Sequence, residues 1–200
     1  MTMADRGVAV TGLGVVTPAG ADEHTLWEGL CAGVSTARGC EELAGLPVDF
    51  GCPVDGIDLD AVVGGRSVWR MARFVKMALV AARQAVADAG LSPERWDGDR
   101  VAVVLGVGVG GVSVLVDNVR RLDDGGADAV SPLLVPMMMP NAAAGEVAIA
   151  LRAHGPSLAP ATACASGGAA NSARPRHLLG DRWDGVGAGG GGGGVSPRGV

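Results

Sequence analysis

The sequence predicts an α/β fold in which helices pack on a sheet. Val8 to Leu13 is a short apolar run that ends in glycines, and it is predicted as a buried strand. Val68 to Ala89 shows helical periodicity, and Arg100 to Leu105 is apolar after its first residue, as in a strand buried on both faces. Strands of this kind that alternate with helices are typical of a layered α/β domain.

Composition and charge limit the class of protein. The chain has 200 residues, of which 48% are hydrophobic, so it can bury a substantial core. Its net charge of −5 argues against a nucleic-acid partner, because such proteins usually carry a basic excess. The four cysteines have neither C-x-x-C nor metal-ligand spacing, so we expect no metal and no cofactor.

Hydropathy argues against a membrane protein. The mean hydropathy is +0.32, yet the longest uncharged apolar stretch, Val101 to Val116, contains four glycines and is too short for a membrane span. Val8 to Val16 is interrupted by polar residues and glycines and does not resemble a secretory signal. We therefore expect a soluble cytoplasmic protein.

The first third of the chain contains one short helix and one irregular segment. Thr25 to Ala32 has apolar residues at helical spacing, whereas residues 33 to 65 are glycine-rich and aperiodic. The helix predicted over Val68 to Ala89 is apolar on most of its surface, so we expect it to be mostly buried. Its basic residues recur at every third position: Arg70, Arg73 and Lys76. Gly90 and Pro93 are expected to end it.

The middle of the chain alternates glycine-rich and helical sequence. Residues 106 to 111, G-V-G-V-G-G, lead into a helix predicted over Val112 to Leu122. A hydrophobic loop interrupted by prolines 132, 136 and 140 follows. Asn141 to Leu151 is predicted as a further helix, with Asn141 as its N-cap.

The most informative stretch is Gly155 to Gly168, which reads G-P-S-L-A-P-A-T-A-C-A-S-G-G. An apolar run stops at Cys164, and the small residues after it are typical of a tight strand-to-helix turn that exposes one nucleophile. A cysteine on the first turn of a helix lies near the positive end of the helix dipole, which favours the reactive thiolate. The alternative is that Cys164 is a small buried hydrophobic residue.

This segment resembles the active-site segment of the β-ketoacyl-[acyl carrier protein] synthases, G-P-S-x-x-x-x-T-A-C-x-S-G, which residues 155 to 167 match at every fixed position. The opening V-A-V-T-G-L-G-V-V-T-P-A-G is also similar to the first strand and turn of these ketosynthases. The resemblance implies the N-terminal half of a thiolase-like fold with αβαβα layers. Residues 1–170 would form the half-domain and 171–200 its poorly matching glycine-rich end, with the C-terminal half absent.

The resemblance implies a decarboxylative Claisen condensation in fatty-acid or polyketide synthesis. Cys164 would take an acyl group from an acyl carrier protein and react with a malonyl-carrier. The implied partners are the carrier protein, acyl and malonyl thioesters, and a second subunit in a homodimer or in a heterodimer with a chain-length partner. The family's two catalytic histidines and lysine belong to its C-terminal half, so this chain is expected to be an incomplete form that cannot condense.

The resemblance also assigns binding residues. Val109 occupies the position of an apolar gate residue, and Leu133 and Leu134 belong to a segment that shapes the acyl tunnel, although both leucines are equally compatible with a simple core. Arg66 and Arg70 lie just ahead of Met71 to Phe74, an M-x-x-F stretch. In the resembled family, basic residues at this place dock the carrier protein. The alternative interpretation is that both arginines belong to the solvated face of a helix.

Three other functions remain open from the residues. Gly106 to Gly111 satisfies G-x-G-x-x-G, which would fit a dinucleotide-binding oxidoreductase or simply a close backbone approach. A cysteine–histidine hydrolase would need a histidine near Cys164, and His154 is expected at the far end of the preceding strand. A non-condensing acyltransferase or a partner subunit of the same fold is the third.

The last thirty residues are expected to be irregular. Pro175 would interrupt the helix that follows Cys164, and the glycine run from Gly189 to Gly194 would make a poor strand because each glycine loses much backbone entropy on ordering.

Overall fold

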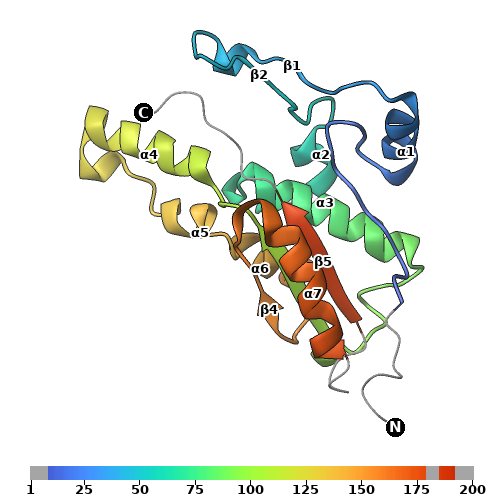
Figure 1. The fold of residues 1–200 in the computed structure, drawn as a ribbon. Helices are drawn as coiled ribbons and strands as arrows, with labels where there is room; N and C mark the ends of the chain where they lie inside the picture. Colours follow the sequence, from blue (N-terminus) through green and yellow to red (C-terminus); the bar gives the residue numbers. More distant parts are fainter. Residues whose placement is uncertain (1–8, 179–184, 192–200) are drawn as a thin grey trace.

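The computed structural model describes residues 9–178 and 185–191, and Figure 1 shows them as a parallel sheet with helices on both faces and a small hairpin apart from it. The sheet has the order β4-β3-β5, from β3 (Val101–Val107), β4 (Ser157–Leu158) and β5 (Gly185–Gly191). Both neighbours run parallel to β3, with Val104 opposite Leu158 and opposite Ala188. The predicted α/β class is confirmed.

The helices form two layers around β3. Helix α7 (Ser166–Leu178) packs on β3 and β5 on one face, while α3 (Arg73–Asp88) and α6 (Ala142–Ala150) pack together on the other (Figure 1). The remaining helices are α1 (Glu23–Ala32), α2 (Leu59–Val63), α4 (Val112–Gly125) and α5 (Leu134–Met138). The hairpin pairs β1 (Arg38–Gly39) with β2 (Phe50–Gly51) inside the segment that we expected to be irregular.

The core lies between β3 and the α3–α6 layer. Val107 of β3 is fully buried in this cluster, and Leu79 of α3 and Val147 of α6 are nearly so. A strand with paired neighbours on both sides has its backbone polar groups satisfied within the sheet, so its side chains can be apolar throughout. The strand predicted over Arg100 to Leu105 is therefore confirmed with shifted bounds: it runs from Val101 to Val107, and Arg100 belongs to the preceding 3₁₀ turn.

The first predicted strand is wrong. Residues 9–14 lie along α3 without strand pairing, and Val8 lies outside the described residues. Side chains of α3 replace a partner strand: the Leu13 N–H donates to Asp88 at 2.8 Å, and the Val15 N–H donates to Gln84 at 2.8 Å. A Cβ on Gly12 would lie 2.1 Å from a carbonyl oxygen of α3, so this glycine permits the close approach.

The long basic helix begins later than predicted. Val68–Arg70 forms a separate 3₁₀ turn, and Ala72 is extended, so α3 starts only at Arg73. The predicted stripe is thus divided: Arg70 lies off the helix, while Lys76 pairs with Asp60 and has a side chain only 15% exposed. Gly90 ends the helix region with φ +65°, as the sequence predicts.

The central helices follow the prediction with two corrections. Helix α4 starts at Val112 as expected, but Leu134–Met138 forms the short helix α5 where the prolines predicted a loop. Pro136 is compatible with this helix because it lies within the first turn, where backbone N–H groups have no intrahelical partner. Asn141 precedes α6, but its side chain makes no capping hydrogen bond.

Both predictions for the C-terminal stretch are wrong. Helix α7 continues through Pro175 to Leu178, and the glycine-rich residues Gly185–Gly191 form strand β5. Of the predicted glycine run, Gly189 to Gly191 belong to this strand, and residues 192–194 lie outside the described residues. The edge of β3 explains the strand, because β5 pairs with all seven residues of β3 and satisfies its second row of backbone groups. Within the described residues, none of the helices combines the length and apolar character needed to cross a membrane.

Candidate active site

Cys164 lies on a tight turn between the sheet and α7. The 3₁₀ turn Ala163–Ala165 carries it, and α7 begins at the next residue, Ser166. The chain reaches the turn alongside β3, since the Val107 N–H donates to the Pro160 carbonyl at 3.0 Å. The Cys164 residue is exposed, which contradicts the alternative of a buried hydrophobic cysteine.

The turn contains a strained residue directly before the cysteine. Ala163 has φ +51°, one of two described non-glycine residues with positive φ. A left-handed conformation costs an L-residue roughly 1–2 kcal/mol, so other contacts must hold it. Strain of this kind is common where a chain must present a functional group at a sharp corner.

The Ser166 hydroxyl group holds the turn together. It accepts a hydrogen bond from the Thr162 N–H at 2.8 Å and shares its own proton between the carbonyls of Ala163 at 2.7 Å and Val107 at 3.1 Å. Ser166 is only 2% exposed. The hydroxyl therefore links the turn, the start of α7 and the end of β3.

Gly106 allows this end of β3 to meet the start of α7. A Cβ on Gly106 would lie 2.0 Å from the Ser166 carbonyl oxygen and 2.9 Å from the Gly167 nitrogen. In the sequence, Ser166 is visible only as one of the small residues after Cys164, whereas a close backbone approach is one of the two interpretations of Gly106 to Gly111. A glycine inside a strand pattern is a recognised sign of close backbone approach, and it was the available signal.

The surroundings of Cys164 can stabilise negative charge. Among the described residues, none accepts a hydrogen bond from the Cys164 backbone N–H. The N-terminus of α7 follows immediately, and the positive end of the helix dipole there favours an oxyanion. Cys164 was predicted on the first turn of the helix, and it lies instead on the short 3₁₀ turn directly before α7.

The glycine loop after β3 packs against α5. The Gly111 N–H donates to the Met138 carbonyl at 3.0 Å, and a Cβ on Gly110, where φ is +93°, would lie 2.5 Å from the same oxygen. The backbone of α5 therefore lies directly against Gly110 and Gly111. This geometry favours the close backbone approach over the dinucleotide-binding alternative.

The predicted binding residues do not form one site. Val109 is 60% exposed, and it does not line the pocket of about 240 Å³ that lies between α3, α5 and α6. Leu133 lines this pocket and Leu134 does not; Cys164 is not part of its wall either. The structure instead brings Leu133 together with Arg70, which was predicted for a different role.

The two predicted docking arginines differ in their surroundings. Arg66 is exposed and without an ion-pair partner among the described residues. The Arg70 guanidinium lies 3.9 Å from the Glu146 carboxylate across the rim of the pocket, and about half of its side chain is exposed. Both arginines are accessible, but of the two only Arg70 has a carboxylate within ion-pair distance in the described part of the chain.

His154 lies at the opposite end of the sheet from Cys164. The Gly155 N–H donates to Val101 at the start of β3, whereas Cys164 follows the end of β3. A strand of seven residues spans roughly 20 Å, so this histidine cannot act as a base for the thiol. Among the described residues there is no group of three or more His, Cys, Asp or Glu side chains that could hold a metal ion.

Comparisons with known proteins agree with this geometry. Residues 5–200 match the family model for the N-terminal domain of β-ketoacyl synthases. The 3-oxoacyl-[acyl-carrier-protein] synthase 2 of Staphylococcus aureus (strain COL) is 36% identical over 165 residues, which are 82% of this chain and 40% of that protein. The enzyme of the same name from Synechocystis is 36% identical over 164 residues, 81% of this chain and 39% of that protein.

Solved structures share the fold. A type II polyketide ketosynthase, in complex with its acyl carrier protein and bound to a hexaketide, superposes with a TM-score of 0.79 at 18% identity over 94% of this chain and 51% of that one. The ishigamide ketosynthase/chain length factor gives 0.75 at 28% identity, over 87% and 49%. The chain spans about two-fifths of the length of the curated relatives. With a thiolase-like half-fold, an exposed cysteine at the turn before α7 and a family match over residues 5–200, this chain belongs to the β-ketoacyl synthase family, as part of its N-terminal domain.

Proposed function

We propose that this chain is the acyl-accepting part of a 3-oxoacyl-[acyl carrier protein] synthase of fatty-acid or polyketide synthesis. The observation that carries the proposal is the turn at Cys164, which presents an exposed thiol and a backbone N–H with no described acceptor at the start of α7. Residues 1–170 would form the N-terminal half-domain, with 171–200 as its glycine-rich end.

The geometry supports acyl transfer to Cys164. The thiolate attacks the carbonyl carbon of an acyl-carrier thioester, and the carbonyl oxygen becomes an oxyanion that the Cys164 N–H stabilises with a hydrogen bond. The C–S bond to the carrier then breaks, and the carrier leaves as a thiolate that takes up a proton from water. The product is an acyl-cysteine thioester, formed without cofactor.

Condensation would follow in the complete enzyme. A malonyl-carrier loses CO₂, its carbanion attacks the acyl-cysteine carbonyl, and the Cys164 thiolate leaves as the 3-oxoacyl-carrier forms. The match covers 40% of the Staphylococcus aureus relative, and the histidines that the family resemblance implies for this step belong to the C-terminal half of the enzyme. Acyl transfer is the step that the turn at Cys164 supports.

Arg66 and Arg70 would dock the acidic carrier protein. Both side chains are accessible, and charged groups at the rim of an interface accelerate encounter with an oppositely charged partner. Arg66→Glu is a cleaner test than Arg70→Glu, because a glutamate at position 70 would face Glu146 and disturb the pocket rim. We expect Arg66→Glu to weaken carrier binding several-fold and to leave thiol reactivity unchanged.

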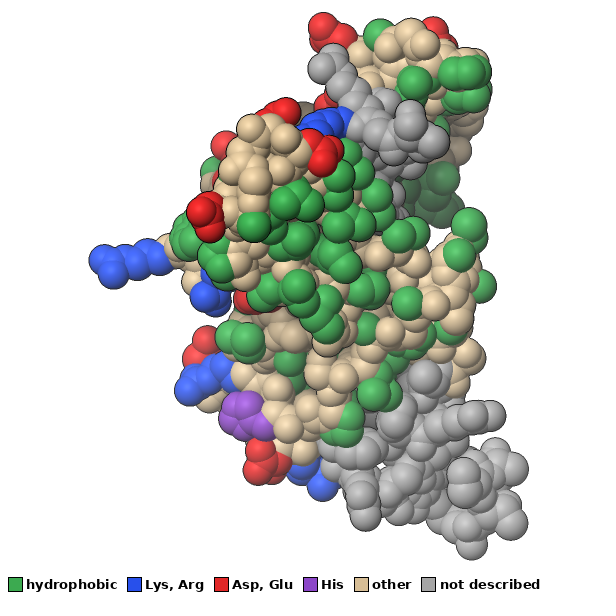
Figure 2. Space-filling view, turned by 90° about the vertical axis from the view of Figure 1, so that its left-hand side faces the viewer, with side chains coloured by type: hydrophobic (Ala, Val, Ile, Leu, Met, Phe, Trp, Pro, Cys, Tyr) green, Lys and Arg blue, Asp and Glu red, His purple; other side chains and the backbone are tan. Residues whose placement is uncertain are grey.

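A second subunit would cover the apolar face formed by α4 and α5. Figure 2 shows hydrophobic side chains gathered on this side of the molecule, and the exposed ones on the two helices are Leu115, Val119, Leu122 and Val135. A surface patch of this kind marks an interaction site. We propose a homodimer, or a heterodimer with a chain-length partner.

The decisive experiment is transfer of an acyl group from an acyl-carrier protein to this chain. Site-resolved mass spectrometry should find the acyl group on Cys164, and Cys164→Ala should abolish it. Cys31 and Cys52 are also exposed and serve as reference thiols in the same molecule. Acylation that is equal at all three cysteines, or absent, would refute the proposed function.

A further inference from the structure

Ser166 is the buried polar side chain next to Cys164, and the chemistry of acyl transfer does not use it. Its hydroxyl group is hydrogen-bonded on both sides of the turn, to the N–H of Thr162 and the carbonyl of Ala163, and also to the carbonyl of Val107. A 2% exposed hydroxyl with these three contacts is fixed in place. The question is which atoms this network fixes in turn.

The hydrogen bond to Ala163 orients one peptide unit. The Ala163 carbonyl and the Cys164 N–H belong to the same planar trans peptide, so they point in opposite directions. The Ala163 oxygen lies 2.7 Å from the buried Ser166 hydroxyl. The Cys164 N–H therefore points away from the buried Ser166 hydroxyl, and Cys164 itself is exposed.

The strain at Ala163 makes this control necessary. With φ at +51°, Ala163 would gain stability by returning to a conformation that L-residues prefer, and that change would rotate the Ala163–Cys164 peptide. The Thr162 N–H and the Ala163 oxygen, on the two sides of Ala163, are bonded to one hydroxyl group. Removing that group frees the Thr162 N–H and leaves the Ala163 oxygen with only the hydrogen bond from the Ser166 backbone N–H.

We propose that Ser166 is a positioning residue that holds the Cys164 N–H in the direction required of an oxyanion donor, and so sets the rate at which Cys164 accepts an acyl group. The inference rests on the proposed function of Cys164. It assigns Ser166 a role in acylation and none in the reactivity of the sulfur itself. Two reagents separate these effects: acylation by a thioester forms an oxyanion, whereas alkylation by iodoacetamide displaces iodide and forms none.

The experiment compares both reactions at Cys164 in the wild-type chain and in Ser166→Ala. S-phenyl thioacetate is the acyl donor and iodoacetamide the alkylating agent, with rates at Cys31 and Cys52 as references. We expect acylation of Cys164 to fall about 10- to 100-fold, since loss of one oxyanion donor has effects of this order or larger, while alkylation changes less than about threefold. Ser172→Ala is the matched control, because Ser172 lies on the same helix and bonds only to carbonyls of α7.

The outcomes are distinct. Wild-type acylation no faster at Cys164 than at Cys31 would refute the proposed acyl acceptor and this inference with it. Fast wild-type acylation that Ser166→Ala retains would overturn the inference alone, as would a parallel fall of acylation and alkylation, which a merely structural role predicts. If Ser166→Ala does not fold, Ser166→Cys fills nearly the same space with a weaker donor, and the same loss of acylation with retained alkylation is expected.

Discussion

Gly106→Ala tests whether close approach of β3 and α7 builds the turn at Cys164. The new Cβ would lie 2.0 Å from the Ser166 carbonyl oxygen and 2.3 Å from its carbonyl carbon. Ordinary contacts of a Cβ begin near 3.4 Å, so the two backbones must separate by more than 1 Å. Both atoms are backbone, and neither can move away as a flexible side chain would.

The expected loss of stability follows from this displacement. Overpacking of a buried site costs about 1–3 kcal/mol, and a clash between two backbones belongs at the upper end. For a chain of this length, a loss of about 3 kcal/mol lowers Tm by roughly 6–12 °C. The separation also moves the Val107 carbonyl away from the Ser166 hydroxyl, so we expect slower acylation of Cys164 as well.

Gly145→Ala is the matched control for this variant. Gly145 lies inside α6, and a Cβ there would meet nothing within 4 Å. Alanine in a helix interior is favoured over glycine by about 0.5–1 kcal/mol, so this variant should be slightly more stable. Thermal and urea unfolding of both variants give the comparison. A Gly106→Ala chain as stable as the wild type would refute the proposed contact between β3 and α7.

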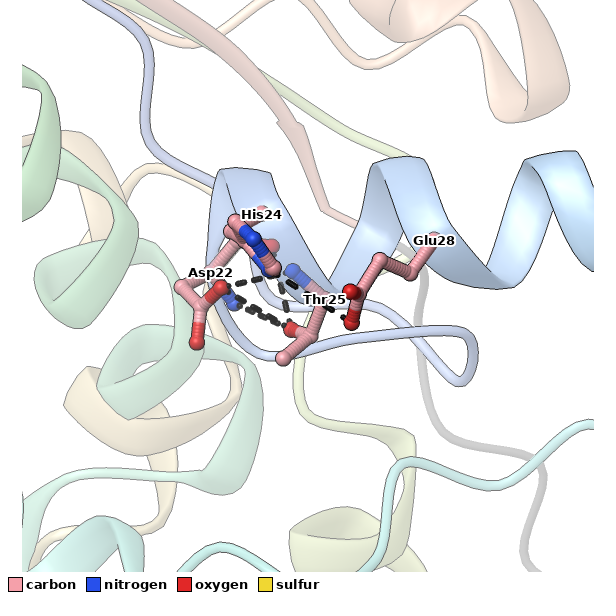
Figure 3. Close-up of polar contacts among 4 residues, drawn as sticks. All are labelled: Asp22, His24, Thr25 and Glu28. Atoms are coloured by element: carbon pink, nitrogen blue, oxygen red, sulfur yellow. Dashed lines mark hydrogen bonds and ion pairs between the residues drawn. The ribbon is translucent and has the colours of Figure 1, made fainter.

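Three further predictions concern the rest of the chain. Asn118→Ala should lower the free energy of unfolding in urea by about 2–3 kcal/mol, because the buried amide accepts from the Ser131 N–H and donates to the Val114 carbonyl, each at 2.8 Å. Asn141→Ala loses no capping hydrogen bond and should change that free energy by less than about 0.5 kcal/mol. The hydrogen bond from the Thr25 N–H lowers the pKa of the Asp22 carboxyl below its usual 3.8 (Figure 3). The stability that the Asp22 carboxylate adds to α1 is therefore complete above the pKa of Asp22 in the unfolded chain, and it is lost as the pH falls through the pKa in the folded chain. Protection of the α1 amides against hydrogen exchange should decline in that acidic range in the wild type and stay constant in Asp22→Asn. Arg66→Glu should raise the Kd for the carrier protein several-fold in a titration at low salt and less at high salt, and an unchanged Kd would count against docking at Arg66.

Local sequence patterns predicted the elements whose causes are local. The buried run of β3 and the start of α4 were found because a continuous apolar strand and a glycine-to-helix transition are visible within ten residues. The exposed Cys164 was predicted from the small residues around it and from the family motif. These features depend on neighbours in sequence, so a window of sequence contains their cause.

The errors occur where a distant segment decides the conformation. Residues 9–14 have the composition of a strand, but the backbone N–H groups of Leu13 and Val15 bond to side chains of α3 about seventy residues away. The glycines of β5 have poor strand propensity, yet the unpaired edge of β3 orders them. The role of Ser166 was hidden for the same reason, since one of its three contacts is Val107, 59 residues earlier.

Ser166 and Gly106 together explain why the turn at Cys164 depends on the whole sheet. Gly106 lets the end of β3 approach the backbone of Ser166, and this approach brings the Val107 carbonyl to the Ser166 hydroxyl. The same hydroxyl fixes the peptide between Ala163 and Cys164. The proposed role of Ser166 would then make the direction of the Cys164 N–H depend on this strand, and Gly106→Ala, which adds one methyl group to β3, should slow acylation without changing the cysteine itself.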